Sequence, residues 1–76
     1  MKYKIGDMFI LDGDRGRDRA IVIIIGEYRC KHTNNVWHVV EYNYLTSTAS
    51  NITEGLRGDD DIDIMINRDK FTYIPA

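Results

Sequence analysis

The chain has 76 residues, of which 43% are hydrophobic and 11% aromatic, and its 10 Lys and Arg against 12 Asp and Glu give a formal net charge of −2. A chain this short is expected to form one domain, residues 1–76, with too small a core for the deep cleft of a large enzyme. The hydrophobic content excludes a disordered chain, and the absence of a broad basic surface makes nucleic acid the less favoured partner.

The first predicted strand covers residues 3–11 and contains a bend at Gly6-Asp7. A glycine followed by an aspartate favours a bulge or bend before the apolar run that begins at Met8. Residues 12–19 contain two glycines, three aspartates and three arginines but no large apolar side chain. This segment is therefore predicted to be an exposed loop.

Residues 20–28 are predicted to form a central strand, because the β-branched run from Ala20 to Ile25 disfavours a helix. The run is apolar on both faces, whereas a half-exposed antiparallel strand would alternate apolar and polar side chains. Something must therefore cover the second face. We expect this face to be covered by another copy of the chain in a homo-oligomer. The alternative is that a helix formed by residues 62–66 covers it.

A polar turn at residues 31–35 leads into a third strand over residues 36–44, which is predicted to form a hairpin with the second strand. Because side chains alternate along a strand, Tyr42 and Tyr44 share a face with His38, and Trp37 lies on the opposite face. Only one of these faces can line the core of a simple barrel. We expect Trp37 to lie in the core.

The segment after residue 44 is less regular. Residues 45–51 are polar and are predicted to be a loop. Asn51 is a good N-cap residue, and Glu54 follows it three positions later, so a single helical turn ending at Gly55 or Gly58 is expected.

Residues 61–67 fit two patterns. Ile62, Ile64 and Ile66 follow the period of a strand, whereas Ile62, Met65 and Ile66 follow the period of a helix whose N-terminus carries aspartates. The three isoleucines favour the strand. A turn and a last strand, residues 71–74, complete the chain before Pro75.

The predicted fold is all-β, either a five-stranded SH3-like barrel or a strongly bent antiparallel sheet, with at most one short helical turn. The residues Ile5-Gly6-Asp7, Ile21 to Gly26 and Trp37 to Tyr42 together resemble the layout of SH3-like small barrels, and the resemblance covers about the first 45 residues. Small acidic proteins of this type occur among the accessory proteins of tailed bacteriophages. The resemblance implies a phage-encoded protein of the host cytoplasm that captures a nucleotide signal or blocks a host protein, and no functional motif allows single residues to be transferred.

The loop of residues 13–19 is the best candidate for an anion site. Its glycines let backbone N–H groups approach an anion, and Arg15, Arg17 and Arg19 supply phosphate donors. The competing interpretation is that the aspartates and arginines of this loop neutralise one another in solvent.

Aromatic side chains of the third strand are candidates for contacts with a ligand base. Tyr42 and Tyr44 offer rings for stacking and His38 offers a hydrogen bond, although most aromatic residues in so small a core are structural.

No metal, cofactor or catalytic group is predicted. The single cysteine, Cys30, cannot form an internal disulfide, which favours a reducing cytoplasm, and its spacing from His32 and His38 does not match a zinc site. The aspartates of residues 12–18 lack the glycine and glutamate of a calcium loop. No paired acids or nucleophile with a base stand out, so an enzyme is not predicted, and no apolar run is long enough to cross a membrane.

These observations predict a non-enzymatic, homo-oligomeric binding protein that captures an anionic small ligand such as a nucleotide. The alternative is an inhibitor of a host protein, whose acidic segment, residues 59–63, masks a basic surface on its target.

Overall fold

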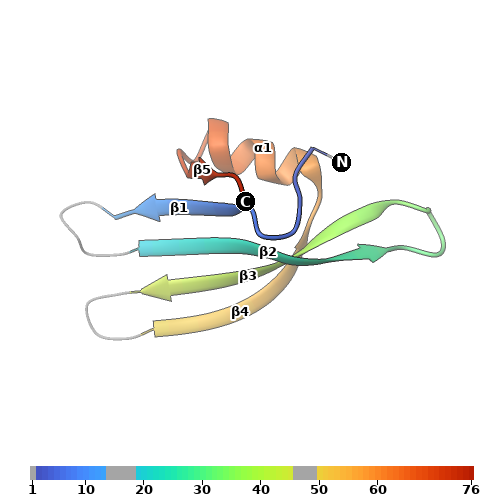
Figure 1. The fold of residues 1–76 in the computed structure, drawn as a ribbon, viewed down its shortest axis with the longest axis horizontal. Coiled ribbons are helices and arrows are strands. Elements are labelled where there is room, and N and C mark those ends of the chain that lie inside the picture. Colours follow the sequence, from blue (N-terminus) through green and yellow to red (C-terminus); the bar gives the residue numbers. More distant parts are fainter. Residues whose placement is uncertain (1, 14–18, 46–49) are drawn as a thin grey trace.

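The computed structural model describes residues 2–13, 19–45 and 50–76, which form one five-stranded antiparallel sheet and one helix (Figure 1). The elements are β1 (Met8–Asp12), β2 (Arg19–Arg29), β3 (Val36–Leu45), β4 (Ser50–Arg57), α1 (Asp59–Asn67) and β5 (Thr72–Ile74). The strand order is β4-β3-β2-β1-β5. The prediction of a five-stranded, mostly-sheet fold is confirmed. Because β4 and β5 are the edges and do not pair with each other in the described residues, the sheet is open and is not a closed barrel.

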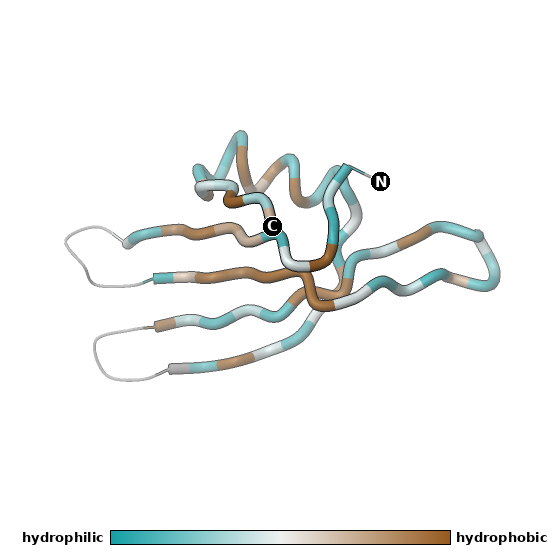
Figure 2. The backbone as a smooth tube through the Cα atoms, viewed as in Figure 1, coloured by the Kyte–Doolittle hydropathy of each residue, from teal (hydrophilic) through white to brown (hydrophobic). Residues whose placement is uncertain are grey.

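The central strands β2 and β3 agree with their predicted ranges to within one residue at each end. Their β-branched and aromatic side chains suit a pleated surface, and Figure 2 shows hydrophobic residues concentrated along β1 and β2. The register between β2 and β3 shifts between Ile24 and Gly26, which marks a bulge.

Beyond this bulge, β2 and β3 project from the sheet as a two-stranded hairpin (Figure 1). The pairing of β1 with β2 ends at Ile23, and the pairing of β4 with β3 ends at His38. Within the described part of the chain, residues 28–37 therefore have no neighbouring strand on either edge. The turn is closed by a bond of 2.8 Å from the Asn34 N–H to the Cys30 carbonyl.

The prediction of a strand at residues 61–67 is wrong, because this segment belongs to the nine-residue helix α1. Asp59, Asp60 and Asp61 occupy its first turn, where negative charge is favoured by the helix dipole. Ile62 and Met65 are buried, whereas Ile64 is exposed. The helical period thus places Ile62 and Met65 on the face that packs against the sheet. In the described segments no helix is long and apolar enough to cross a membrane.

The prediction of a helical turn after Asn51 is also wrong, because Ser50–Arg57 is the edge strand β4. It pairs with β3 along its whole length, with Thr53 opposite Tyr42 and Gly55 opposite Val40. Backbone pairing with β3 outweighs the local helix-start signal of Asn51 and Glu54.

The core lies between α1 and one face of the sheet. Its buried side chains are contributed by the N-terminal segment, the three strands β1 to β3 and the helix, and they are Tyr3, Phe9, Val22, Ile24, Val40, Ile62 and Met65. The expected place of Trp37 is wrong. Trp37 is only partly buried, whereas the neighbouring His38 is 1% exposed and lies on the core side with Val40.

The bend predicted at Gly6-Asp7 is confirmed. Gly6 has a φ of 96°, and its N–H donates to the Ile24 carbonyl at 2.9 Å. A β-carbon at this position would lie 3.1 Å from that of Ala76.

We expect Gly6→Ala to lower the free energy of unfolding by about 1–2 kcal/mol, because alanine is strained at positive φ. Urea titration of both proteins at one concentration measures the difference. Gly26→Ala is the control, since its added carbon would meet only Val39 at ordinary contact distance, 3.8 Å, and its φ is not positive. An equal loss in both variants would contradict this role of Gly6.

Candidate functional site

Tyr42 and Tyr44 lie on the same face of β3 as the core residue Val40, but farther along the strand. Their rings stack with centroids 6.1 Å apart and an interplanar angle of 5°. The Tyr44 side chain is 47% exposed. The sequence prediction that these two rings share a face is therefore confirmed, and one of them is available for stacking.

Arg57 comes from the end of β4 and lies against the inner tyrosine. Its guanidinium carbon is 5.1 Å from the centroid of the Tyr42 ring, which is the geometry of a cation–π contact. Gly55 lies beside this ring, and a β-carbon there would be in van der Waals contact with Tyr42 Cε2, at 3.4 Å. Of the salt bridges between described residues, none includes Arg57.

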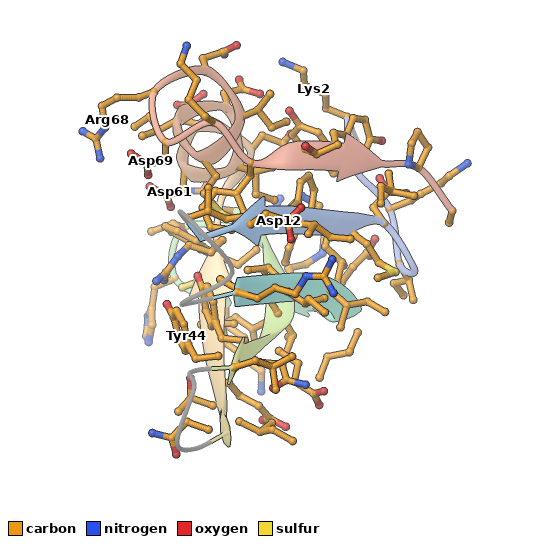
Figure 3. The ribbon with its side chains drawn as sticks, turned by 90° about the vertical axis from the view of Figure 1, so that its left-hand side faces the viewer. Lys2, Asp12, Tyr44, Asp61, Arg68 and Asp69 are labelled. Atoms are coloured by element: carbon orange, nitrogen blue, oxygen red, sulfur yellow. The ribbon has the colours of Figure 1, made fainter. Side chains whose placement is uncertain are left out.

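The C-terminal half of α1 forms the opposite wall, and together these groups enclose a cleft of about 400 Å³. Figure 3 shows Asp61, Arg68 and Asp69 on the same side of the sheet as Tyr44. We call this the tyrosine cleft, and its lining residues are Tyr42, Tyr44, Arg57, Asp61, Ile64, Met65, Arg68, Asp69 and Phe71.

The charges of the tyrosine cleft balance, since it holds two arginines and two aspartates. Arg68 Nε lies 3.1 Å from Asp69 Oδ1, and the Arg68 side chain is 76% exposed. Asp61 accepts a hydrogen bond of 3.1 Å from the Gly58 N–H at the start of the helix. Arg57 is thus the cation of this cleft that is not already opposite a carboxylate.

The hydroxyl of Tyr42 is buried and has no hydrogen-bond partner in the described part of the chain. Burial raises the pKa of Tyr42 above its ordinary value of 10, and the positive charge of Arg57 opposes this rise. The hydroxyl therefore stays protonated at neutral pH.

Arg19, one of the three arginines predicted to bind phosphate, does not line this cleft. Arg15 and Arg17 lie outside the described residues. Arg19 begins β2, and its Nε pairs with Asp12 Oδ1 at 2.8 Å. Ala20 is the residue opposite Tyr44, so Arg19 points to the other face of the sheet from the tyrosines.

His38 does not line the tyrosine cleft either. Its ring is 1% exposed, and its Nε2 lies 2.6 Å from Asp59 Oδ1, which connects the core of the sheet to the start of α1. Its Nδ1 is buried without a partner in the described residues. In this structure the imidazole holds the helix on the sheet and is not accessible to a ligand. The described residues include no group of three or more His, Cys, Asp or Glu side chains that could hold a metal ion.

Sequence reasoning missed Arg57 and Arg68 as partners of the tyrosines. Arg57 was hidden because β4 was expected to be a loop with a helical turn, which gives no register with β3. Arg68 was hidden because residues 61–67 were expected to be a strand. The helical spacing of Ile62, Met65 and Ile66 is the sequence signal that could have predicted a helix here, with Arg68 close to the sheet.

A second cavity, of about 380 Å³, lies between Trp37 and the N-terminus of α1. Its charged lining residues are Asp59, Asp60 and Asp61. Three carboxylates repel the anion that a helix N-terminus would otherwise attract. This cavity is therefore a poor site for the predicted ligand.

Three aspartates of the acidic segment, residues 59–63, bond to other groups of the same chain. Asp59 bonds to His38, Asp61 accepts from Gly58, and Asp63 accepts from Lys2 Nζ at 2.9 Å and from the Tyr3 hydroxyl at 2.6 Å. These three carboxylates thus stabilise the start of the helix and attach the helix to the sheet and to the N-terminal segment.

The chain was compared with models of protein families, with curated proteins and with solved structures, and none of these matches it.

Proposed function

We propose that this protein is a non-enzymatic binding protein whose tyrosine cleft captures a small ligand with an aromatic ring and an anionic group, such as a nucleotide. The observation that carries the proposal is the stacked pair of Tyr42 and Tyr44, with the guanidinium of Arg57 against the inner ring. Tyr44 provides a platform for a base, and Arg57 and Arg68 provide donors for a phosphate.

The balance of charge in the cleft narrows the ligand class. Asp61 and Asp69 oppose a polyphosphate, because each further negative charge would face two carboxylates. The same carboxylates accept hydrogen bonds from ribose hydroxyls or from an exocyclic amino group. A nucleoside monophosphate or a cyclic nucleotide therefore fits better than a triphosphate. Removal of such a nucleotide signal from an infected cell, the role implied by the resemblance to phage accessory proteins, is the biological setting that we propose.

The alternative function, in which the acidic segment masks a basic protein surface, has less support. Three of the four aspartates in residues 59–63 already bond to groups of the same chain, and only Asp60 has no such bond among the described residues. A surface that imitates a polyanion needs carboxylates free to meet a partner.

Isothermal titration calorimetry with AMP, adenosine and ribose 5-phosphate tests the proposal. AMP is expected to bind more tightly than either fragment, because the fragments lack the phosphate or the base. Tyr44→Ala should weaken the binding of AMP about tenfold, since stacking on an aromatic side chain contributes roughly 1–3 kcal/mol per base. Arg57→Gln should weaken AMP and ribose 5-phosphate but leave adenosine nearly unchanged.

Tyr28→Ala and Arg29→Ala are matched controls in the protruding hairpin. Tyr28 is 49% exposed, close to the 47% of Tyr44, but it lies outside the tyrosine cleft. Both controls should bind AMP like the wild-type protein. The proposal fails if no nucleoside monophosphate or cyclic nucleotide binds with a Kd below about 1 mM, or if Tyr28→Ala weakens binding as much as Tyr44→Ala does.

A further inference from the structure

Residues 28–37, which we call the hairpin arm, project from the sheet, and neither edge of the arm pairs with another strand in the described part of the chain (Figure 1). The arm is regular, with Tyr28 opposite Trp37 and Arg29 opposite Val36. A two-stranded hairpin alone is marginally stable in water, because it needs a third strand or a packed layer for support. The hairpin arm is therefore a surface that a partner would stabilise.

The tip of the hairpin arm is cationic. Residues 28–40 contain no Asp or Glu, and the exposed side chains at the tip include Arg29, Lys31 and His32. Arg29 also holds the turn, since its guanidinium donates to the Asn34 side-chain oxygen at 3.0 Å. Of the salt bridges between described residues, none includes Arg29 or Lys31. The positive charges of the tip are thus left without a carboxylate in that part of the chain.

The base of the same arm borders a surface of opposite charge. The cavity of about 380 Å³ between Trp37 and the N-terminus of α1, which we call the acidic cavity, has Asp59, Asp60 and Asp61 as its charged lining residues. Residues 58–67 contain no Lys or Arg. Lys2 bonds to Asp63, which does not line this cavity. Its three carboxylates suit a cation, and the Trp37 ring offers an apolar wall for the stem of a long cationic side chain.

We propose that the hairpin arm of one copy places its tip in the acidic cavity of a second copy, and that the second copy does the same in return. The two arms then run antiparallel about a two-fold axis, with each tip against the base of the other arm. Lys31 meets the partner's Asp60, and Asp60 meets the partner's Lys31. The same contact is therefore made twice, as a two-fold interface requires.

Charge complementarity identifies the second copy as the occupant. A nucleic acid would be attracted by the cationic tip but repelled by the carboxylates at the base of the same arm. A basic protein would fit the acidic cavity but would be repelled by the tip. Only a partner that carries both surfaces satisfies both, and a second copy of this chain carries them in the required arrangement. Since two copies occupy both surfaces of each other, association stops at the dimer.

This dimer does not depend on the proposed nucleotide site. Among the described lining residues, the acidic cavity and the tyrosine cleft share only Asp61, and no residue of the tip lines the tyrosine cleft. Asp60 lies outside that cleft as well. Binding of AMP and formation of the dimer can therefore be measured separately, and failure of one proposal would leave the other standing.

Sedimentation equilibrium of the 76-residue protein at hundreds of micromolar tests the exchange of arms. The expected mass is twice the chain mass of 8.8 kDa. Lys31→Glu and Asp60→Lys each place like charges at both contacts of the dimer. Each variant should remain folded by circular dichroism, because both side chains are exposed, and should associate at least about tenfold more weakly than the wild-type protein.

An equimolar mixture of the two variants is the decisive measurement. In a dimer of Lys31→Glu with Asp60→Lys, Glu faces Asp60 replaced by Lys at one contact, and the native pair of Lys31 with Asp60 is kept at the other. Opposite charges are thus restored at both contacts, and the mixture should sediment as a dimer. A contact within one chain would not be restored by mixing.

Lys70→Glu is the matched control, because it makes the same change of charge at an exposed lysine beyond the C-terminal end of α1. It should dimerise like the wild-type protein. Monomer mass for the wild-type protein would overturn the proposal, and so would a dimer that persists in both Lys31→Glu and Asp60→Lys, or a mixture of the two that stays monomeric. A trimer or larger assembly would exclude the two-fold exchange.

Discussion

Replacing Ile62 by Ala is expected to lower the free energy of unfolding by about 2–5 kcal/mol, the range found for truncation of a large buried aliphatic side chain. Ile62 is 0% exposed and packs from α1 into the core between the helix and the sheet. The truncation removes favourable contacts on the sheet side and leaves a cavity that neighbouring side chains cannot fill completely. Urea titration followed by circular dichroism, at one protein concentration, measures the loss.

Ile64→Ala is the control, and it also distinguishes a helix from a strand. In the helix, Ile64 points away from the core and is 42% exposed, so its truncation should cost less than about 1 kcal/mol. In a strand, Ile62 and Ile64 would share one face and respond alike. Similar large losses in the two variants would therefore contradict the position of α1.

Asp7→Ala is expected to have the second large effect, on the order of 3 kcal/mol. The Asp7 side chain is 0% exposed, and its carboxylate accepts hydrogen bonds from three groups. These donors are the Lys4 N–H at 3.1 Å, the Tyr73 hydroxyl at 2.8 Å and the Ala76 N–H at 2.9 Å. Removal of the carboxylate leaves all three without their acceptor and releases the two ends of the described chain from each other.

The effect of Asp7 should depend on pH in a defined direction. Burial by itself raises the pKa of this carboxyl, but its three hydrogen bonds outweigh burial and leave the pKa below the ordinary value of 3.8. The unfolded chain therefore takes up the proton at a higher pH than the folded chain does. The stabilisation is complete above about pH 4 and is lost as the pH falls through the folded-state pKa.

Urea titrations of the wild-type protein and of Asp7→Ala at several pH values test this dependence. The difference between the two proteins should be largest near neutral pH and should shrink below pH 3.8. Asp12→Ala is a suitable control, because the Asp12 side chain is 71% exposed and its ion pair with Arg19 lies at the surface. It should change stability by less than about 1 kcal/mol. A pH-independent loss in Asp7→Ala would refute the role of the ionised carboxylate.

The parts of the fold that depend on local pattern could be predicted from the sequence. The β-branched run of β2 and the aromatic residues of β3 are unfavourable in a helix and suit a sheet, so both strands were placed correctly. The bend at Gly6 was recognisable because a glycine followed by an aspartate favours a bend before an apolar run.

The parts of the fold that depend on contacts between distant residues could not be predicted from the sequence. Edge strand β4 has few apolar residues, and its structure comes from backbone pairing with β3. In α1, three isoleucines suggest a strand, but burial of Ile62 and Met65 and the aspartates of the first turn favour the helix. His38 was expected to face a ligand, but its bond to Asp59 makes burial of the imidazole acceptable.

In the candidate site, too, the features of a single strand could be predicted and the contacts between distant elements could not. The shared face of Tyr42 and Tyr44 is a property of one strand and was predicted. The approach of Arg57 and Arg68 requires the register of β4 and the position of α1, which the local pattern does not contain.

Completion of this sheet requires two distant parts of the chain to meet, because β5 pairs with β1 and Tyr73 reaches Asp7, 66 positions earlier. The four strands β1 to β4 are joined in succession and close only short loops. The entropy lost in loop closure grows with loop length, so addition of β5 has the largest entropic cost of any pairing in the sheet. The expected folding order is therefore the four-stranded meander first and β5 last. Until β5 arrives, the outer edge of β1 is unpaired, and a partly folded chain is most prone to aggregate at that edge.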